Sequence, residues 1–218
     1  MKTNNLFSKC LAVSLAAMLL LAGGCKKDND EITDGDGNVY TPVSIGTQVW
    51  LKENLKTTRY NDGTAIPYET SDDWDGLTSA AYCWFGNVEG NKDIYGGLYN
   101  LYVVKTGKVC PSGFHVPSRG EVTTLTDFLG ANAGGQMKSM TLWNAPNEGA
   151  TNISGFTALP GGARTTSFIQ NNMRAYFWTS TPEGTGSGYF FYLSYDNALV
   201  VQDTRWGSNG LSIRCVQD

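Results

Sequence analysis

Residues 110–130, CPSGFHVPSRGEVTTLTDFLG, decide the fold because they contain the clearest helix signal in the chain. Ser118 supplies an N-cap hydroxyl, and Glu121 follows three residues later, as a capping box requires. Gly130 is a natural residue to end the helix. Helical spacing places the following side chains on one apolar face: Val122, Leu125, Phe128 and Leu129. We therefore predict a helix between Ser118 and Gly130 that packs against the strands on either side.

Three cysteines lie in the part of the chain that surrounds this helix. Cys110 stands at its entry, and Cys215 lies in the alternating segment LSIRCV near the end of the chain. Cys83 lies within a run of aromatic residues, where a buried thiol is ordinary. We predict a Cys110–Cys215 disulfide that leaves Cys83 over, and a bridge from Cys83 to either of the others is the alternative.

The flanking segments read as short strands joined by long loops. The predicted strands cover residues 39–45, 49–51, 80–85, 95–104, 175–181, 188–195, 198–203 and 210–216. Asp196 and Asn197 read as a two-residue hairpin turn, and residues 134–162 read as an ordered loop. In residues 188–195 aromatic side chains alternate onto both faces, so one face is core and the other is either covered or exposed. The pattern predicts an α+β domain of short antiparallel strands, one or two helices and long ordered loops.

The N-terminus reads as an export signal. Lys2 and Lys9 precede an apolar run over residues 11–21, which is too short to span a bilayer, and small residues precede Cys25. This arrangement resembles the lipobox of bacterial lipoproteins. We therefore predict a signal peptide over residues 1–24 and an acylated Cys25 that anchors the protein in a lipid bilayer. An ordinary signal peptide is the alternative.

Residues 25–38 are polar and rich in Gly and Asp, so we predict a flexible tether there and a single domain over residues 39–218. The lysines and acids directly after Cys25 resemble the signal that sends some lipoproteins to the cell surface. We therefore expect an outer-membrane, surface-exposed location. The formal net charge is −4, and removing two lysines with residues 1–24 makes it −4 − 2 = −6. This acidity argues against nucleic acid as a partner.

No catalytic or metal-binding motif stands out. His115 is the single histidine, and one histidine cannot build the usual zinc sets, so we expect a hydrogen-bonded structural role. Asp34, Asp36 and Asn38 have the spacing of a calcium loop, but Val39 stands where the loop needs Gly. We therefore predict no metal, no cofactor and no enzymatic activity.

Candidate ligand-binding residues gather near the ends of the last strands. Carboxylate and amide oxygens bind sugars, and a tryptophan can stack on a sugar face. We predict a site formed by Asp196, Asn197, Asp203, Trp206 and Asn209. The Glu-Pro-Asn and Trp-Asn-Asp motifs of calcium-dependent lectins are absent. Trp74 among the acids of residues 72–75 is either a second sugar subsite or a solvated turn.

Several blocks of the sequence together resemble the Fibrobacter succinogenes major paralogous domain family of bacterial surface lipoproteins. These blocks are residues 36–40, 45–55, 95–100, 110–118, 155–164, 177–181 and 212–216, and they extend over nearly all of residues 36–218. The resemblance implies a fold similar to the C-type-lectin-like domain and a relation to formylglycine-generating enzymes. It supplies no family-wide activity.

These observations predict a surface-anchored lipoprotein that binds an extracellular glycan or protein without catalysis. A structural component of a surface assembly is the alternative. An oxidase or hydrolase related to formylglycine-generating enzymes is less favoured, because that oxidation uses a pair of cysteines. With Cys110 and Cys215 bridged, Cys83 would be left alone.

Overall fold

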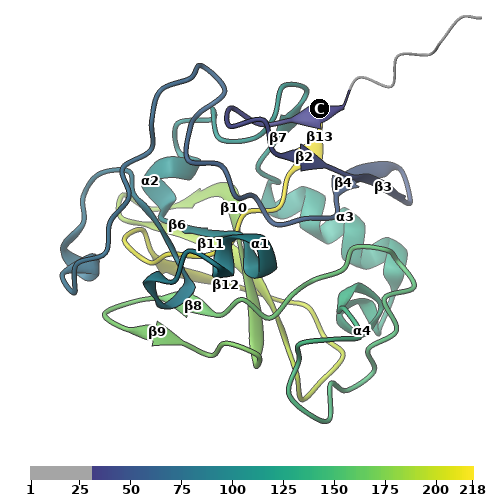
Figure 1. The fold of residues 1–218 in the computed structure, drawn as a ribbon. Coiled ribbons are helices and arrows are strands. Elements are labelled where there is room, and N and C mark those ends of the chain that lie inside the picture. The colour runs from purple at the N-terminus through teal and green to yellow at the C-terminus, as the bar shows by residue number, and fades with distance from the viewer. Residues whose placement is uncertain (1–30) are drawn as a thin grey trace, which may run out of the picture. The chain divides into compact units, whose positions relative to one another are not determined.

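The computed structural model describes residues 31–218, which form an α+β domain of mostly short antiparallel strands (Figure 1). The predicted signal peptide and the lipidation of Cys25 lie outside the described residues. Within residues 31–218, no helix combines the length and the hydrophobicity that crossing a bilayer requires.

A three-stranded antiparallel sheet occupies the centre of the domain. Its strands are β10 (Arg174–Glu183), β11 (Ser187–Ser194) and β12 (Val201–Trp206), in that order. Alternate residues enter two separate cores, so Trp178 and Phe190 pack on one face while Phe177 and Phe191 pack on the other. Both faces of β11 are therefore covered. The second face of its alternating aromatic residues, which the sequence left as either covered or exposed, is covered.

The end of the chain differs from the strands predicted over residues 188–195, 198–203 and 210–216. Asp196 and Asn197 do not form a two-residue turn, because β12 begins only at Val201 and a loop over residues 195–200 precedes it. The terminal segment instead runs parallel to β10, where the Trp178 N–H donates to the carbonyl of Ser212 at 3.1 Å. It then joins a second sheet.

That second sheet has four strands in the order β3-β4-β13-β7. They are β3 (Pro42–Ile45), β4 (Gln48–Leu51), β13 (Val216–Gln217) and β7 (Phe114–His115). The predicted strands over residues 39–45 and 49–51 are confirmed in β3 and β4, which pair as a hairpin, and Gly46 takes the positive φ of 61° that its tight turn needs. Through β13 and β7, the end of the chain lies beside the entry to the main helix.

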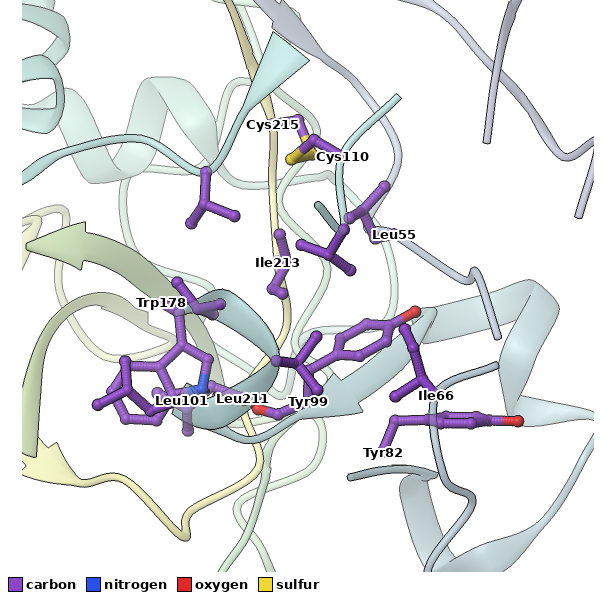
Figure 2. Packing of buried hydrophobic residues seen from close by; sticks show 14 of the residues in the cluster. Leu55, Ile66, Tyr82, Tyr99, Leu101, Cys110, Trp178, Leu211, Ile213 and Cys215 are labelled. Atoms are coloured by element: carbon purple, nitrogen blue, oxygen red, sulfur yellow. Dashed lines mark hydrogen bonds between the residues drawn. A yellow bond between two sulfur atoms is a disulfide. The ribbon is translucent and has the colours of Figure 1, made fainter. Parts of the chain in front are cut away.

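The predicted disulfide is confirmed where these segments meet. Cys110 and Cys215 are bonded with their Cα atoms 6.1 Å apart. Figure 2 shows the bond at one end of the larger core cluster, beside Leu55 and Ile213. Cys83 is buried and free.

The main helix is α3 (Arg119–Leu129), and its predicted capping box is confirmed. The Glu121 N–H donates to Ser118 Oγ at 3.2 Å, and the Ser118 N–H donates to Glu121 Oε2 at 2.7 Å. Val122 and Leu125 are fully buried, whereas Phe128 is 64% exposed. Its assignment to the buried face was wrong, because its ring covers the backbone of Gly46 rather than entering the core.

The domain has short helices that the sequence reasoning did not find. They are α1 (Asn91–Tyr95), α2 (Leu101–Val104) and α4 (Ala133–Met137), together with the 3₁₀ turns η1 (Trp74–Gly76) and η2 (Phe85–Asn87). The predicted strand over residues 95–104 ends at Tyr99, because Asn100 caps α2 by accepting the N–H of Val103 at 3.3 Å. Its strand portion, β6 (Gly97–Tyr99), pairs with β5 (Tyr82–Trp84), and a separate ribbon joins β8 (Ala163–Arg164) to β9 (Phe168–Ile169).

The last part of the predicted tether belongs to the folded domain. Residues 31–38 lie in a hairpin in which β1 (Ile32–Thr33) pairs with β2 (Val39–Tyr40). The Asp34 carboxylate closes this hairpin by accepting the N–H groups of Asp36 and Asn38, at 2.9 and 3.0 Å. Tyr40 also donates its hydroxyl to Asp34, at 2.5 Å. These bonds satisfy the carboxylate internally, which explains why the polar run is ordered.

A buried lysine organises the long loop after α3. The Lys138 Nζ donates to the carbonyl oxygens of Glu148, Ser194 and Asn197 at 2.7, 2.9 and 2.9 Å. Its side chain is fully buried. It therefore ties α4 and its following loop to the far end of β11.

Candidate functional site

The most exposed aromatic side chain of the domain stands at the end of β12. Trp206 is 72% exposed, whereas Trp50, Trp74 and Trp178 are fully buried. Tryptophan side chains are mostly buried in folded proteins, because they are among the largest apolar side chains. Its exposure marks this end of the central sheet as a candidate binding surface.

Trp206 lines two open hollows. The first has a volume of about 390 Å³ and the second about 500 Å³. Trp206 and Asn209 line both of them. The first hollow is otherwise lined by Asp75, Gly76, Leu77, Thr78, Tyr102, Gly186, Gly207 and Ser208, and the second by Glu183, Ser187, Thr204 and Arg205.

The backbone around Trp206 is fixed by close packing. Trp206 pairs with Ser187 at the end of the sheet, and the Gly207 N–H donates to the carbonyl of Gly186 at 2.7 Å. The Leu101 N–H donates to the carbonyl of Gly207 at 2.9 Å, which places the start of α2 beneath the turn. A Cβ at Gly188 would lie 2.7 Å from Leu101 Cδ1, so glycine is needed for this approach. The indole therefore projects from a rigid support.

Asn209 links the two hollows and is held by a core-packed arginine. The Arg205 guanidinium lies 4.8 Å from the ring centre of Tyr176 and 5.3 Å from that of Phe190. It donates to Asn209 Oδ1 at 3.3 Å. Within residues 31–218, the Asn209 amide nitrogen donates to no other residue, which leaves it available to a ligand.

The loop that walls the first hollow comes from a distant part of the chain. Asn100 fixes this loop by donating to the carbonyl of Ser79 at 2.8 Å and accepting the N–H of Ala81 at 3.1 Å. Trp74 is fully buried, so it cannot stack on a ligand. Its neighbour Asp75 instead faces the same hollow as Trp206. The structure thus joins the two regions that the sequence suggested separately as sugar subsites.

Only part of the predicted site is brought together. Trp206 and Asn209 are neighbours, but Asp196 and Asn197 precede β12 and lie beyond its opposite end. Five residue steps of about 3.3 Å separate the two ends of this strand by roughly 16 Å. Asp203 lies within the strand, and its Oδ1 accepts the N–H of Thr204 at 2.8 Å. Of the five predicted residues, the structure therefore brings Trp206 and Asn209 together and places Asp196 and Asn197 beyond the other end of the strand.

Asp196 and Asn197 take part in the fold of the loop instead. The Asn197 side chain donates to Asp196 Oδ1 at 3.0 Å, and its carbonyl accepts from Lys138 at 2.9 Å. These bonds explain the polar pair without a ligand.

A third hollow of about 230 Å³ lies beside α1. Lys52, Lys56 and Lys92 line it, and Lys56 is paired with Asp93 at 2.9 Å. Its aromatic lining residue, Tyr95, is buried. This hollow therefore offers no exposed ring for stacking.

The reactive side chains of the domain are engaged elsewhere. His115 lies between Asp218 Oδ1 and Glu121 Oε1, at 2.7 and 2.8 Å, so its predicted hydrogen-bonded role is confirmed. Burial opposes the charge on its ring, but the two carboxylates outweigh this effect and raise the pKa of His115. Burial raises the pKa of the Cys83 thiol to about 12. Residues 31–218 contain no group of three or more His, Cys, Asp or Glu side chains that could hold a metal ion.

Sequence reasoning missed Thr78, Tyr102 and Ser208 as lining residues. Tyr102 was assigned to a strand, although Asn100 before an apolar run was a usable N-cap signal for a helix. Thr78 carried no signal of its own, because its place depends on the distant Asn100 contacts.

The comparisons with known proteins agree with the sequence resemblance. A family model described as the Fibrobacter succinogenes major domain matches residues 43–217. Neither a curated protein nor a solved structure matches the chain. Because the matched residues make up most of its length, the chain belongs to the Fibrobacter succinogenes major domain family.

Proposed function

We propose that this protein is a non-enzymatic binding module that recognises a glycan through Trp206. The observation that carries the proposal is an indole that is 72% exposed on a tightly packed turn and lines two open hollows. Sugars present an apolar face of C–H groups and a rim of hydroxyls. An exposed indole surrounded by hydrogen-bonding groups complements both features.

The surroundings of Trp206 favour a sugar over a protein ligand. Protein-binding surfaces have an apolar centre built from several side chains. Around Trp206 the neighbouring groups are mostly hydrogen-bonding, with Asp75, Thr78, Ser208 and Asn209 lining the same hollows. One ring within a polar rim matches the size of a single sugar unit.

The non-enzymatic part of the proposal rests on where the nucleophiles and bases lie. Cys83 is buried and the pKa of its thiol is raised. Cys110 and Cys215, which could have formed a cysteine pair with it, are bonded to each other in the disulfide. His115 in β7 is held between the carboxylates of Glu121 and Asp218. The hollows beside Trp206 contain neither residue.

We further propose that acylated Cys25 anchors this domain in the outer membrane with its binding surface outside the cell. The small residues before Cys25 and the charged run after it support this location. For the fold, we propose a variant of the C-type-lectin-like domain, which the block order of the family resemblance supports. A structural role in a surface assembly would not require an exposed indole that lines two hollows.

The proposal is tested by applying the protein to an array of neutral, uronic-acid and sulfated glycans. We expect binding to at least one class, and Trp206→Ala should abolish it. Phe128→Ala is the matched control, because Phe128 is an exposed ring (64%) on α3, away from the hollows. Binding that survives Trp206→Ala, or no binding by the intact protein to any glycan, would overturn the proposal.

A further inference from the structure

We infer that the Trp206 surface binds an internal segment of a neutral glycan chain, with one sugar on the indole and its neighbours in the two hollows. This inference rests on the proposed function and adds the length and the charge of the ligand. It follows from the position of Trp206 as the wall shared by both hollows.

The size of the hollows indicates more than one sugar unit. Their volumes of about 390 and 500 Å³ each fall in the range of roughly 300–1,000 Å³ typical of small-molecule sites. A single sugar stacked on Trp206 would leave most of this space to water. A chain of three units would use the indole and both hollows at once.

Both hollows are open to solvent, so neither forms a closed end. A site that recognises the terminus of a chain needs a wall beyond the last sugar. Asp75 lines the first hollow and Glu183 the second, so a chain that fills both hollows can extend past either residue. The geometry therefore fits an internal segment.

The charges of the lining residues indicate that the chain is neutral. Asp75 is the only charged residue lining the first hollow. In the second hollow Glu183 accompanies Arg205, whose guanidinium is stacked on core rings and bonded to Asn209. In the first hollow a uronic acid or a sulfated sugar would meet the Asp75 carboxylate without a cation, and in the second the charges of Arg205 and Glu183 offset each other, so neither hollow offers an anionic sugar a net positive charge.

The test measures affinity against chain length by isothermal titration calorimetry. The probes are cello-, xylo- and manno-oligosaccharides of one to six units, with galacturonate oligomers of the same lengths. For at least one neutral series we expect affinity to rise about tenfold or more from one to three units and to level off soon afterwards. The galacturonate oligomers should bind at least about tenfold more weakly.

Variants that fill one hollow test the geometry. A Cβ at Gly186 would lie 3.9 Å from Trp206 Cζ3, an ordinary contact, so Gly186→Leu fills the first hollow without a clash at Cβ. Thr204→Tyr occupies the second hollow from a partly exposed strand position. Each variant should lose the gain in affinity from longer chains, and a gain as large as that of the unaltered protein in both variants would contradict the extended site.

The outcomes separate the two proposals. If mono- and hexasaccharides bind equally and Trp206→Ala abolishes both, the chain-length inference fails while the glycan-binding function stands. Preferred binding of galacturonate oligomers overturns the neutral-chain assignment. If no saccharide binds at any length, both proposals fail. The length series on the unaltered protein decides these cases even where a variant does not fold.

Discussion

Breaking the Cys110–Cys215 disulfide is the perturbation whose effect on stability follows most directly from the structure. The bond joins residues 105 positions apart. Closing a loop of this length restricts the unfolded chain and stabilises the fold by about 4.7 kcal/mol in the chain-entropy account. A domain of this size changes its Tm by roughly 2–4 °C per kcal/mol. We therefore expect full reduction to lower the Tm by about 9–19 °C.

Scanning calorimetry with and without a phosphine reductant measures this change. Cys110→Ala and Cys215→Ala should lower the Tm by similar amounts, because each removes the same bond, and neither variant should respond further to the reductant. Cys83→Ala is the control and should keep the full reductant-dependent drop, since Cys83 is free. An unchanged Tm after reduction, with thiol titration showing that the bond is broken, would refute the reasoning. Loss of the reductant effect in Cys83→Ala would refute it equally.

Three further changes test the packing. The raised pKa of His115 and the lowered pKa of its glutamate partner mean that this ion pair stabilises the fold most between about pH 4.5 and 6.5. We expect the urea midpoints of wild type and His115→Gln to differ most within this window. The difference should shrink as the pH rises through the raised histidine pKa and as it falls through the lowered glutamate pKa. A difference that does not change with pH would contradict the stabilising role of this ion pair. Lys138→Met leaves three carbonyls without their donor and should cost at least about 3 kcal/mol in urea unfolding, so a loss below about 1 kcal/mol would contradict the role of this clamp. Gly134→Ala should destabilise the fold, because the added Cβ would lie 2.2 Å from the carbonyl oxygen of Leu199. Gly120→Ala in α3 should stabilise the fold by about 0.5–1 kcal/mol, because the nearest neighbour of its added Cβ lies 3.8 Å away. Changes of Tm with the same sign for both variants would count against the packing around α4.

The parts of the fold that depend on local signals were predictable from the sequence. The capping box of α3 and the glycine turn between β3 and β4 need only residues a few positions apart. The disulfide followed from counting the cysteines of a chain that the sequence predicts to be exported. The α2 helix was missed because its four residues continue an apolar, aromatic run that resembles a strand. The Asn100 N-cap, rather than the composition of these four residues, indicates that they form a helix.

The site was only half predictable because its geometry depends on strand pairing and on contacts between distant segments. Trp206 and Asn209 were identified from chemistry, and one turn keeps them together. Asp196 is close to them in sequence but lies beyond the other end of β12, which no residue type reveals. Asp75 joins Trp206 only because the Asn100 side chain fixes the intervening loop. Local sequence patterns do not predict contacts between segments this far apart in the chain.

The central claim, that Trp206 is the contact point for a neutral glycan, is tested most directly by the indole N–H signals in an NMR titration. All six tryptophans of the sequence lie in the described domain, and Trp206→Phe assigns the signal of interest. Cellohexaose, xylohexaose and mannohexaose are added in turn. The account predicts that at least one of them shifts the Trp206 signal while those of the buried Trp50, Trp74 and Trp178 stay in place. Shifts confined to other tryptophans, or no shift with any of the three sugars, would contradict it.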